Sequence, residues 1–214
     1  MSQAVRSVRL VLLGVTCPVC GAPGRAPCVS CAGRLRPAPP LVPPPGVDAC
    51  LALLAYEGAG RELVARLKYR NHRAVVPGLA AAMASLVTGP DGADLDVDLV
   101  TWMPTTPARR RQRGYDQAEL LARAVARHLH RPCPRLLLRR PGPPQTGRPL
   151  AERHRGPQVL ALRRVEGVAV LLVDDVVTSG SSARVSAQAL RSAGARSVVV
   201  LAAARTPQPG AVLH

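Results

Sequence analysis

The sequence predicts an α/β protein, a parallel sheet flanked by helices, that is preceded by a small module with four cysteines. After residue 47, short apolar segments of strand length alternate with amphipathic segments of helix length. One of these segments, Val168–Val173, is apolar without interruption, which is typical of a central strand buried on both faces. The chain has 214 residues, of which 47% are hydrophobic, enough for one ordinary domain and a small appendage.

Four of the six cysteines form two CxxC pairs near the amino terminus. Two CxxC turns aim four thiolates at one centre and complete a tetrahedral site, for which Zn²⁺ is the expected metal. Two disulfides would need an oxidising compartment, and a redox CxxC would need a thioredoxin-like βαβ context. Neither context is evident, so zinc is favoured over both. The expected ligands are Cys17, Cys20, Cys28 and Cys31.

A proline-rich stretch at Gly33–Val47 marks a domain boundary, because such a stretch is extended and semi-rigid. We expect a zinc-binding module with its linker at residues 1–47 and the α/β domain at 48–214. The apolar run Val8–Val15 is too short to span a bilayer, and no signal-peptide cleavage site follows it. We therefore expect no transmembrane segment and a cytoplasmic protein.

The elements of the α/β domain follow from hydrophobic periodicity and from Gly and Pro positions. The expected strands are Cys50–Tyr56, Val97–Met103, Leu136–Leu138, Val168–Val173 and Val198–Ala203. The expected helices are Arg61–Tyr69, Val75–Val87, Asp116–Leu129 and Ser181–Ala193, and Arg139–Pro157 is expected to be a long loop. Ligands of parallel sheets bind beyond the carboxyl ends of the strands, so the residues after Met103 and Val173 are the candidates for a site.

The segment Val170–Ser182 reads VLLVDDVVTSGSS and predicts such a site. Two carboxylates follow the apolar strand, where they can accept hydrogen bonds from ribose hydroxyls and balance a hydrated Mg²⁺. A hydroxyl-bearing turn then opens a helix, whose amino terminus favours a phosphate. A solvated strand end with a capped helix does not account for two acids directly after five apolar residues. The candidate residues are Asp174, Asp175, Thr178, Ser179, Gly180, Ser181 and Ser182.

The net charge of +16 favours anionic partners such as nucleic acid or phosphorylated substrates. Fifteen arginines and only three acidic residues lie between Arg109 and Arg164, so most of the excess charge is local. Composition bias and a solvated basic turn remain alternatives to a functional role. The chain has only four aromatic residues, which argues against a stand-alone protein that stacks single-stranded bases.

The VLLVDDVVTSGSS segment resembles the phosphoribosyl-diphosphate motif of type I phosphoribosyltransferases, and nearly the whole chain resembles the ComF (competence protein F-like) family. That resemblance includes the two CxxC pairs and Gln145 and Arg153 in the long loop. It also includes Tyr56-Glu57-Gly58, Leu67-Lys68-Tyr69 and Arg113-Gly114-Tyr115-Asp116-Gln117. The chain departs from the family at Asp116, where Asn is usual, near Gly156, where Asn is common, and at Ser182, where Thr is usual.

The resemblance implies a type I phosphoribosyltransferase-like fold and a set of roles in binding phosphoribosyl diphosphate. Thr105, in the loop Pro104–Pro107, would contact the diphosphate, and Lys68, Arg109 and Arg113 would supply cations to it. Arg139–Pro157 would be a loop that closes over the site. An enzyme of this kind would transfer phosphoribosyl to a base or an amine with Mg²⁺. The family's association with competence implies an alternative: an accessory protein that binds single-stranded DNA beside a DNA-uptake helicase.

Overall fold

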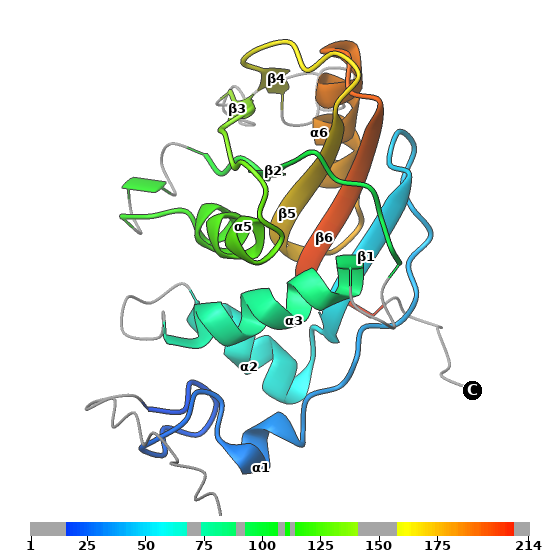
Figure 1. The fold of residues 1–214 in the computed structure, drawn as a ribbon. Helices are drawn as coiled ribbons and strands as arrows, with labels where there is room; N and C mark the ends of the chain where they lie inside the picture. Colours follow the sequence, from blue (N-terminus) through cyan, green and yellow to red (C-terminus); the bar gives the residue numbers. More distant parts are fainter. Residues whose placement is uncertain are drawn as a thin grey trace, which may run out of the picture.

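A four-stranded parallel sheet in the order β1-β6-β5-β2 forms the centre of the fold (Figure 1). The structure is a computed structural model that describes residues 16–67, 74–88, 93–106, 110–111, 114–140 and 158–207. The strands are β1 (Ala49–Ala55), β2 (Leu99–Trp102), β5 (Ala169–Val177) and β6 (Ser197–Arg205). The first five residues of β5 and nearly all of β6 are buried, as expected for strands covered on both faces.

Helices cover both faces of this sheet. On one side lie α2 (Gly58–Arg66), α3 (Val76–Thr88) and α5 (Gln117–His128), and on the other lies α6 (Ser181–Ser192) (Figure 1). The buried side chains of α5 recur at helical spacing, with Leu121, Ala122 and Val125 fully enclosed between α3 and the sheet. The predicted α/β architecture of a parallel sheet flanked by helices is confirmed.

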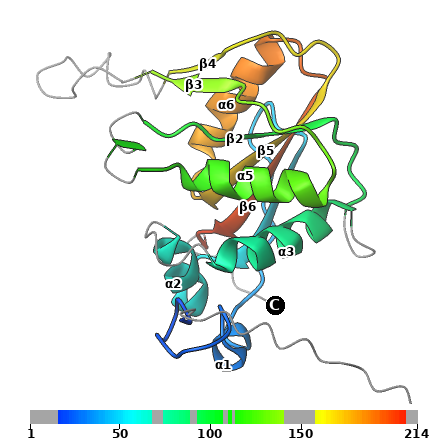
Figure 2. The ribbon, with the colours of Figure 1, turned by 60° about the vertical axis from the view of Figure 1, so that its left-hand side comes forward.

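A second, two-stranded sheet lies above β2 and α5 and beside α6 (Figure 2). It consists of β3 (Leu137–Arg139) and β4 (Val159–Ala161), which pair antiparallel. Thr101 in β2 fastens it to the main sheet, because its hydroxyl donates to Pro134 O and accepts from Leu136 N. The sequence pattern predicted β3 within one residue but missed β4, whose three residues have no alternation to detect.

The amino-terminal module contains the four-residue helix α1 (Val29–Ala32), and the proline-rich segment then runs along the sheet. Pro37 forms a bridge with Leu54 of β1, and the guanidinium of the buried Arg205 donates to the carbonyls of Pro39 and Pro40. Pro44 lies close to the turn before α6. The linker is thus packed against the α/β domain, and the division of the chain at residue 47 stays a prediction.

Most of the predicted elements lie within a few residues of the observed ones, but two differ in a way that matters. The acidic pair was expected after the end of a strand, yet β5 continues through it to Val177. The reason is that β6 runs on to Arg205 and offers Ala202 and Ala204 as partners. Helix α2 begins earlier than expected, at Gly58, and ends at Arg66; Tyr69 lies outside the described residues.

In the described part of the chain, we find no helix with the length and apolar character needed to cross a membrane.

Candidate functional site at the carboxyl end of β5

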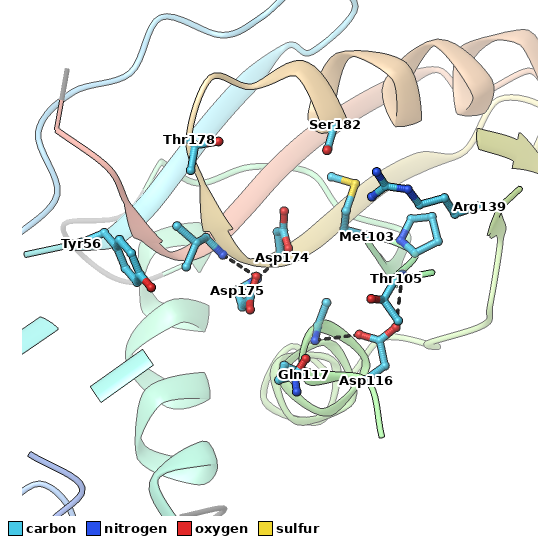
Figure 3. Close-up of a pocket in the computed structure, with 13 residues that line it drawn as sticks. Tyr56, Met103, Thr105, Asp116, Gln117, Arg139, Asp174, Asp175, Thr178 and Ser182 are labelled. Atoms are coloured by element: carbon cyan, nitrogen blue, oxygen red, sulfur yellow. Dashed lines mark hydrogen bonds between the residues drawn. The ribbon is translucent and has the colours of Figure 1, made fainter. Parts of the chain in front are cut away.

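A cavity opens at the end of β2, which is shorter than the adjacent strand β5. Strand β2 ends with Trp102 opposite Val173, whereas β5 and β6 stay paired as far as Val177 and Arg205. The last residues of β5 therefore have a strand neighbour on one side only, and the space beside them holds about 290 Å³. Such a volume is near the lower end of the range for small-ligand sites, about 300–1,000 Å³. The lining residues are Tyr56, Met103, Pro104, Thr105, Asp116, Gln117, Ala118, Arg139, Asp174, Asp175, Val176, Thr178 and Ser182 (Figure 3).

Asp174 and Asp175 both line this cavity and are half-buried. Each carboxylate accepts a hydrogen bond from the next backbone N–H along the strand: Asp175 N donates to Asp174 Oδ1 and Val176 N donates to Asp175 Oδ1, both at 2.8 Å. Each of these bonds joins a side chain to the residue that follows it in the strand. They hold both carboxylates in place at the open edge of β5.

A third carboxylate, that of Asp116, closes the cavity from the opposite side. Its Oδ1 accepts from Ala118 N at 3.1 Å and so caps the amino terminus of α5, and its Oδ2 accepts from Thr105 N at 3.4 Å. One buried acid thus fixes both the helix start and the loop after β2. This is the position where the family usually has Asn, which can accept similar hydrogen bonds but carries no charge.

The pKa values of two of the three carboxylates, Asp174 and Asp116, are raised, and burial is the largest cause for both. Burial, followed by the charge of Asp175 and by that of Asp116, raises the pKa of Asp174 well above its usual range. Burial also raises the pKa of Asp116, although the N–H donors of Thr105 and Ala118 act against it. A ligand that brings positive charge or hydroxyl donors into the cavity would relieve this repulsion.

The turn before α6 leaves the amino terminus of that helix open. The helix begins after Gly180, which has a φ of 72°, in the left-handed region that glycine adopts without strain. Gly180 offers no capping side chain, Ser181 N donates to Ser179 Oγ at 3.5 Å, and the first turn contains no acidic residue. Ser179 and Ser181 hydrogen-bond each other through their hydroxyls at 2.8 Å, while Thr178 and Ser182 line the cavity. Helix α6 therefore differs from α5, whose first turn is capped by the acidic side chain of Asp116.

The acids at the other end of the sheet have a different role. Asp48 accepts from Arg191 and from Val198 N, and Asp98 accepts from Arg196 and from Ala169 N. The N–H of Ala169 and the Arg196 charge lower the pKa of Asp98. These two acids are paired with cations and tie strands together, whereas the acids of the cavity face one another.

The remaining predicted residues divide into two groups. Thr105 lines the cavity, as the resemblance implies. Lys68, Arg109 and Arg113 lie outside the described residues. Sequence reasoning did not name Arg139 as a ligand contact, yet its guanidinium reaches in from β3 beside Met103 (Figure 3). Tyr56 and Gln117 also line the cavity. Both belong to sequence segments that resemble the ComF family, and this resemblance could have identified them as site residues.

The four predicted metal ligands come together in the amino-terminal module. The sulfurs of Cys17, Cys20, Cys28 and Cys31 all lie within 4.8 Å of one another, an arrangement that can hold a metal ion. Burial raises the pKa of the Cys17 thiol, but N–H donors from Cys28, Cys20 and Val19 outweigh it and lower that pKa to about 6. Burial raises the pKa of Cys50 and of Cys133, which lie away from the cluster, to about 11.

Comparison with known proteins places the chain among relatives of the same extent. No protein-family model matches it. The chain is 29% identical over 200 residues to the curated "DNA utilization protein YhgH" of Salmonella typhimurium, covering 89% of this chain and 84% of that protein. The protein of the same name from Salmonella typhi matches equally well. Because the similarity covers nearly all of both proteins, it extends well beyond the VLLVDDVVTSGSS segment.

Three solved structures have some similarity to this chain, with TM-scores between 0.41 and 0.43. They include the glutamine phosphoribosylpyrophosphate amidotransferase of B. subtilis (22% identity, TM-score 0.43, 64% of this chain and 30% of that one). A second is the purine phosphoribosyltransferase of Pyrococcus horikoshii (15% identity, TM-score 0.43, 64% of this chain and 77% of that one). A third, "the allosteric regulatory enzyme of purine biosynthesis", has 24% identity and a TM-score of 0.41, and the alignment covers 59% of this chain. The chain spans about a quarter of the length of that third protein and less than a third of the amidotransferase.

The burial of the Asp174 carboxyl, next to the charge of Asp175, predicts that Asp174→Asn stabilises the protein. A carboxyl whose pKa rises on folding loses its contribution to stability as the pH rises from about 3.9, the unfolded value, through the folded pKa. Above the folded pKa, the neutral amide should therefore raise the free energy of unfolding by about 1 kcal/mol. The advantage should disappear at acidic pH. Thermal unfolding followed by circular dichroism across the pH range measures both effects.

Asp98→Asn is the matched control, for which we expect the opposite change in stability. The pKa of Asp98 is lowered on folding, so its contribution to stability is present above the unfolded pKa and is lost as the pH falls through the folded value. The amide should therefore lower the unfolding midpoint at neutral pH. If Asp174→Asn also lowers that midpoint at neutral pH, the acids of the cavity do not repel one another as described.

Proposed function

We propose that the cavity at the end of β5 binds phosphoribosyl diphosphate, or a closely similar ribose phosphate, together with Mg²⁺. The observation that carries the proposal is that Asp174 and Asp175 share one cavity with the hydroxyls of Thr178 and Ser182. A pure phosphate site would gain nothing from carboxylates, and a pure cation site would gain nothing from an uncapped helix terminus. A sugar phosphate with an accompanying cation uses both.

The 5′-phosphate belongs at the amino terminus of α6. The N–H of Ser181 donates to Ser179 Oγ at 3.5 Å, but no acidic side chain caps the first helical turn, where the helix dipole is positive. The Thr178 and Ser182 hydroxyls are positioned to donate to the same phosphate, and Ser179 and Ser181 flank it. A side chain at Gly180 would meet Pro44 at 3.3 Å, so glycine also lets the proline-rich linker lie against this turn.

The ribose belongs over Asp174 and Asp175, whose remaining oxygens can accept hydrogen bonds from its 2- and 3-hydroxyls. Oxygen donors of this kind suit Mg²⁺, which keeps several waters and bridges carboxylates to phosphates. When bound, Mg²⁺ would neutralise the diphosphate and lower the repulsion among the acids. The guanidinium of Arg139 and the loop that contains Thr105 would then contact the diphosphate. We assign the same role to Lys68, Arg109 and Arg113.

For transfer, the chain's own residues would position the sugar and exclude water while an acceptor displaces diphosphate from C1 of the ribose. The acceptor would be a base or an amine. Tyr56 and Gln117, on the cavity wall, are the described residues that we assign to the acceptor side.

Isothermal titration of the full chain with phosphoribosyl diphosphate and Mg²⁺ tests the proposal. We expect one ligand per chain, with an affinity that falls at least about tenfold when Mg²⁺ is left out. Because the pKa of Asp174 is raised, the ligand should bind more weakly as the pH falls through that pKa, and binding near it should release protons. Titrations in two buffers that differ in ionisation enthalpy measure this release.

Asp174→Asn/Asp175→Asn should abolish binding while the protein stays folded, because both amides can still accept the strand N–H bonds. Asp98→Asn, at the opposite end of the sheet, should bind as the wild type does. A wild-type protein that does not bind the ligand with Mg²⁺ at neutral pH would end the proposal.

We propose further that the four-cysteine cluster of the amino-terminal module holds a structural Zn²⁺. A tetrahedral zinc site with Zn–S bonds of about 2.3 Å separates its sulfurs by about 3.8 Å. Cys20 Sγ and Cys28 Sγ are 3.8 Å apart, and Cys17 Sγ accepts from Cys28 N at 3.5 Å, a bond typical of metal-bound thiolates. Four thiolates leave no open position, so the metal would act in folding rather than in catalysis.

The purified chain should contain about one zinc per molecule, measured by atomic emission. Cys31→Ser should lose the metal and lower the unfolding midpoint, because metal binding stabilises a module with little apolar core. Cys133→Ser is the control, since this half-buried thiol lies outside the cluster. Equal zinc content in the two variants would contradict the assignment.

A second candidate function is binding of single-stranded DNA, in support of a helicase during DNA uptake. The name of the YhgH relatives refers to DNA utilization. The observation on this chain is a row of exposed arginines, Arg123, Arg127 and Arg131, spaced four residues apart along α5 and beyond its end. They line a hollow of about 560 Å³ outside the ribose-phosphate cavity, and Arg123 lies over the Trp102 ring at 5.3 Å.

If this row binds phosphates, single-stranded DNA should bind with a steep salt dependence, since each contact releases counterions. Arg127→Ala/Arg131→Ala should weaken binding and reduce the log–log salt slope by about 1.4, or about 0.7 for each lost contact. Arg66→Ala, which removes an exposed arginine of α2, is the control. Fluorescence anisotropy at several salt concentrations measures the slope. An affinity that does not change with salt contradicts DNA binding by this surface.

A further inference from the structure

Another hollow lies between β4 and α6. It measures about 920 Å³ and is lined from Gln158 to Arg164 on one wall and by α6 on the other. Its lining includes the apolar side chains of Leu160, Leu162, Val185 and Ala189. Leu160 is 39% exposed and Leu162 is 49% exposed, although large apolar side chains are usually covered. We call this hollow the β4–α6 groove.

The edge of β4 supplies unpaired backbone groups. Strand β4 pairs only with β3 in the sheets of the described chain. Leu162 N donates to Leu136 O and Arg140 N donates to Gln158 O, so the register places Leu160 in the hydrogen-bonded pair between them. Val159 and Ala161 therefore belong to the alternate pairs, whose N–H and C=O groups point away from β3. Such an edge accepts an added strand.

The rim of the groove is positively charged. Arg163, Arg164 and Arg184 line it, and no acidic residue does so among the described residues. Arg164 is paired with Glu166, and no ion pair with a described residue engages Arg163 or Arg184. A matching occupant therefore carries acidic residues at its flanks and apolar residues where it meets Leu160 and Leu162.

We propose that the β4–α6 groove binds an extended acidic segment of a partner protein, which adds a strand to the edge of β4. Main-chain hydrogen bonds to Val159 and Ala161 give affinity, and alternate apolar side chains fill the floor between Leu160 and Val185. Acidic side chains on either side of the bound strand form ion pairs with Arg163 and Arg184. This groove is a separate hollow from the ribose-phosphate cavity, with Ser181 at the boundary between them, and it lies apart from the α5 arginine row.

The test selects a displayed library of random short peptides against the full chain, with Leu160→Asp/Leu162→Asp as the counter-target. Both leucines are exposed, so the variant should keep the wild-type unfolding midpoint. We expect enriched peptides in which Asp or Glu alternates with β-branched residues. Their affinity should fall at least about tenfold for Leu160→Asp/Leu162→Asp and for Arg163→Glu/Arg184→Glu, and stay unchanged for Val42→Asp, an exposed apolar residue elsewhere.

A second readout separates strand addition from simple apolar contact. Ala161→Pro removes an outward N–H and leaves the β3–β4 ladder intact, so it should weaken the selected peptide, as should N-methylation of alternate peptide residues. No enrichment over the counter-target, or enriched peptides that are not acidic, would overturn the proposal. So would binding that survives both backbone changes. If Leu160→Asp/Leu162→Asp instead alters the sedimentation of the chain alone, the groove joins two copies and the proposal is wrong.

Discussion

The pairing of β5 with β6 beyond the end of β2 is the constraint on which the candidate site depends. Because β6 continues to Arg205, β5 stays extended through Asp174 and Asp175 although its other neighbour has ended at Trp102. The uncovered edge becomes the wall of a cavity, and each carboxylate accepts a hydrogen bond from the next backbone N–H along the strand. A longer β2 would fill the cavity with a strand, and a shorter β6 would release the acids from their positions.

The acidic side chains at the two ends of the sheet have different surroundings. At the amino end, Asp48 and Asp98 are neutralised by Arg191 and Arg196 and fasten the strands. At the carboxyl end, three acids face one another in a chain that otherwise carries a large excess of arginine. Burial, together with the charge of Asp175, raises the pKa of Asp174, and such a cost to stability persists in functional sites where a ligand relieves it. We therefore interpret the cavity as a site arranged for a cation-bearing or hydroxyl-rich ligand.

The sequence predicts the sheet, the main helices and the cysteine cluster because each has a local signal: apolar runs, helical periodicity or CxxC spacing. It misplaces the end of β5, since nothing in VLLVDDVV reveals that β6 is long enough to keep the acids paired. It also misses β4 and Arg139 as a cavity residue, because both depend on how the small two-stranded sheet sits over β2. Asp116 was noted as a departure from the family, but its double role as helix cap and cavity wall is visible only in the fold.

A crystal structure of the full chain with phosphoribosyl diphosphate and Mg²⁺ tests the central claim most directly. The account predicts the 5′-phosphate at the amino terminus of α6, beside Thr178 and Ser182, with the ribose hydroxyls on Asp174 and Asp175. A ligand bound elsewhere, or one whose phosphate avoids α6 while its diphosphate lies on the acids, would contradict it.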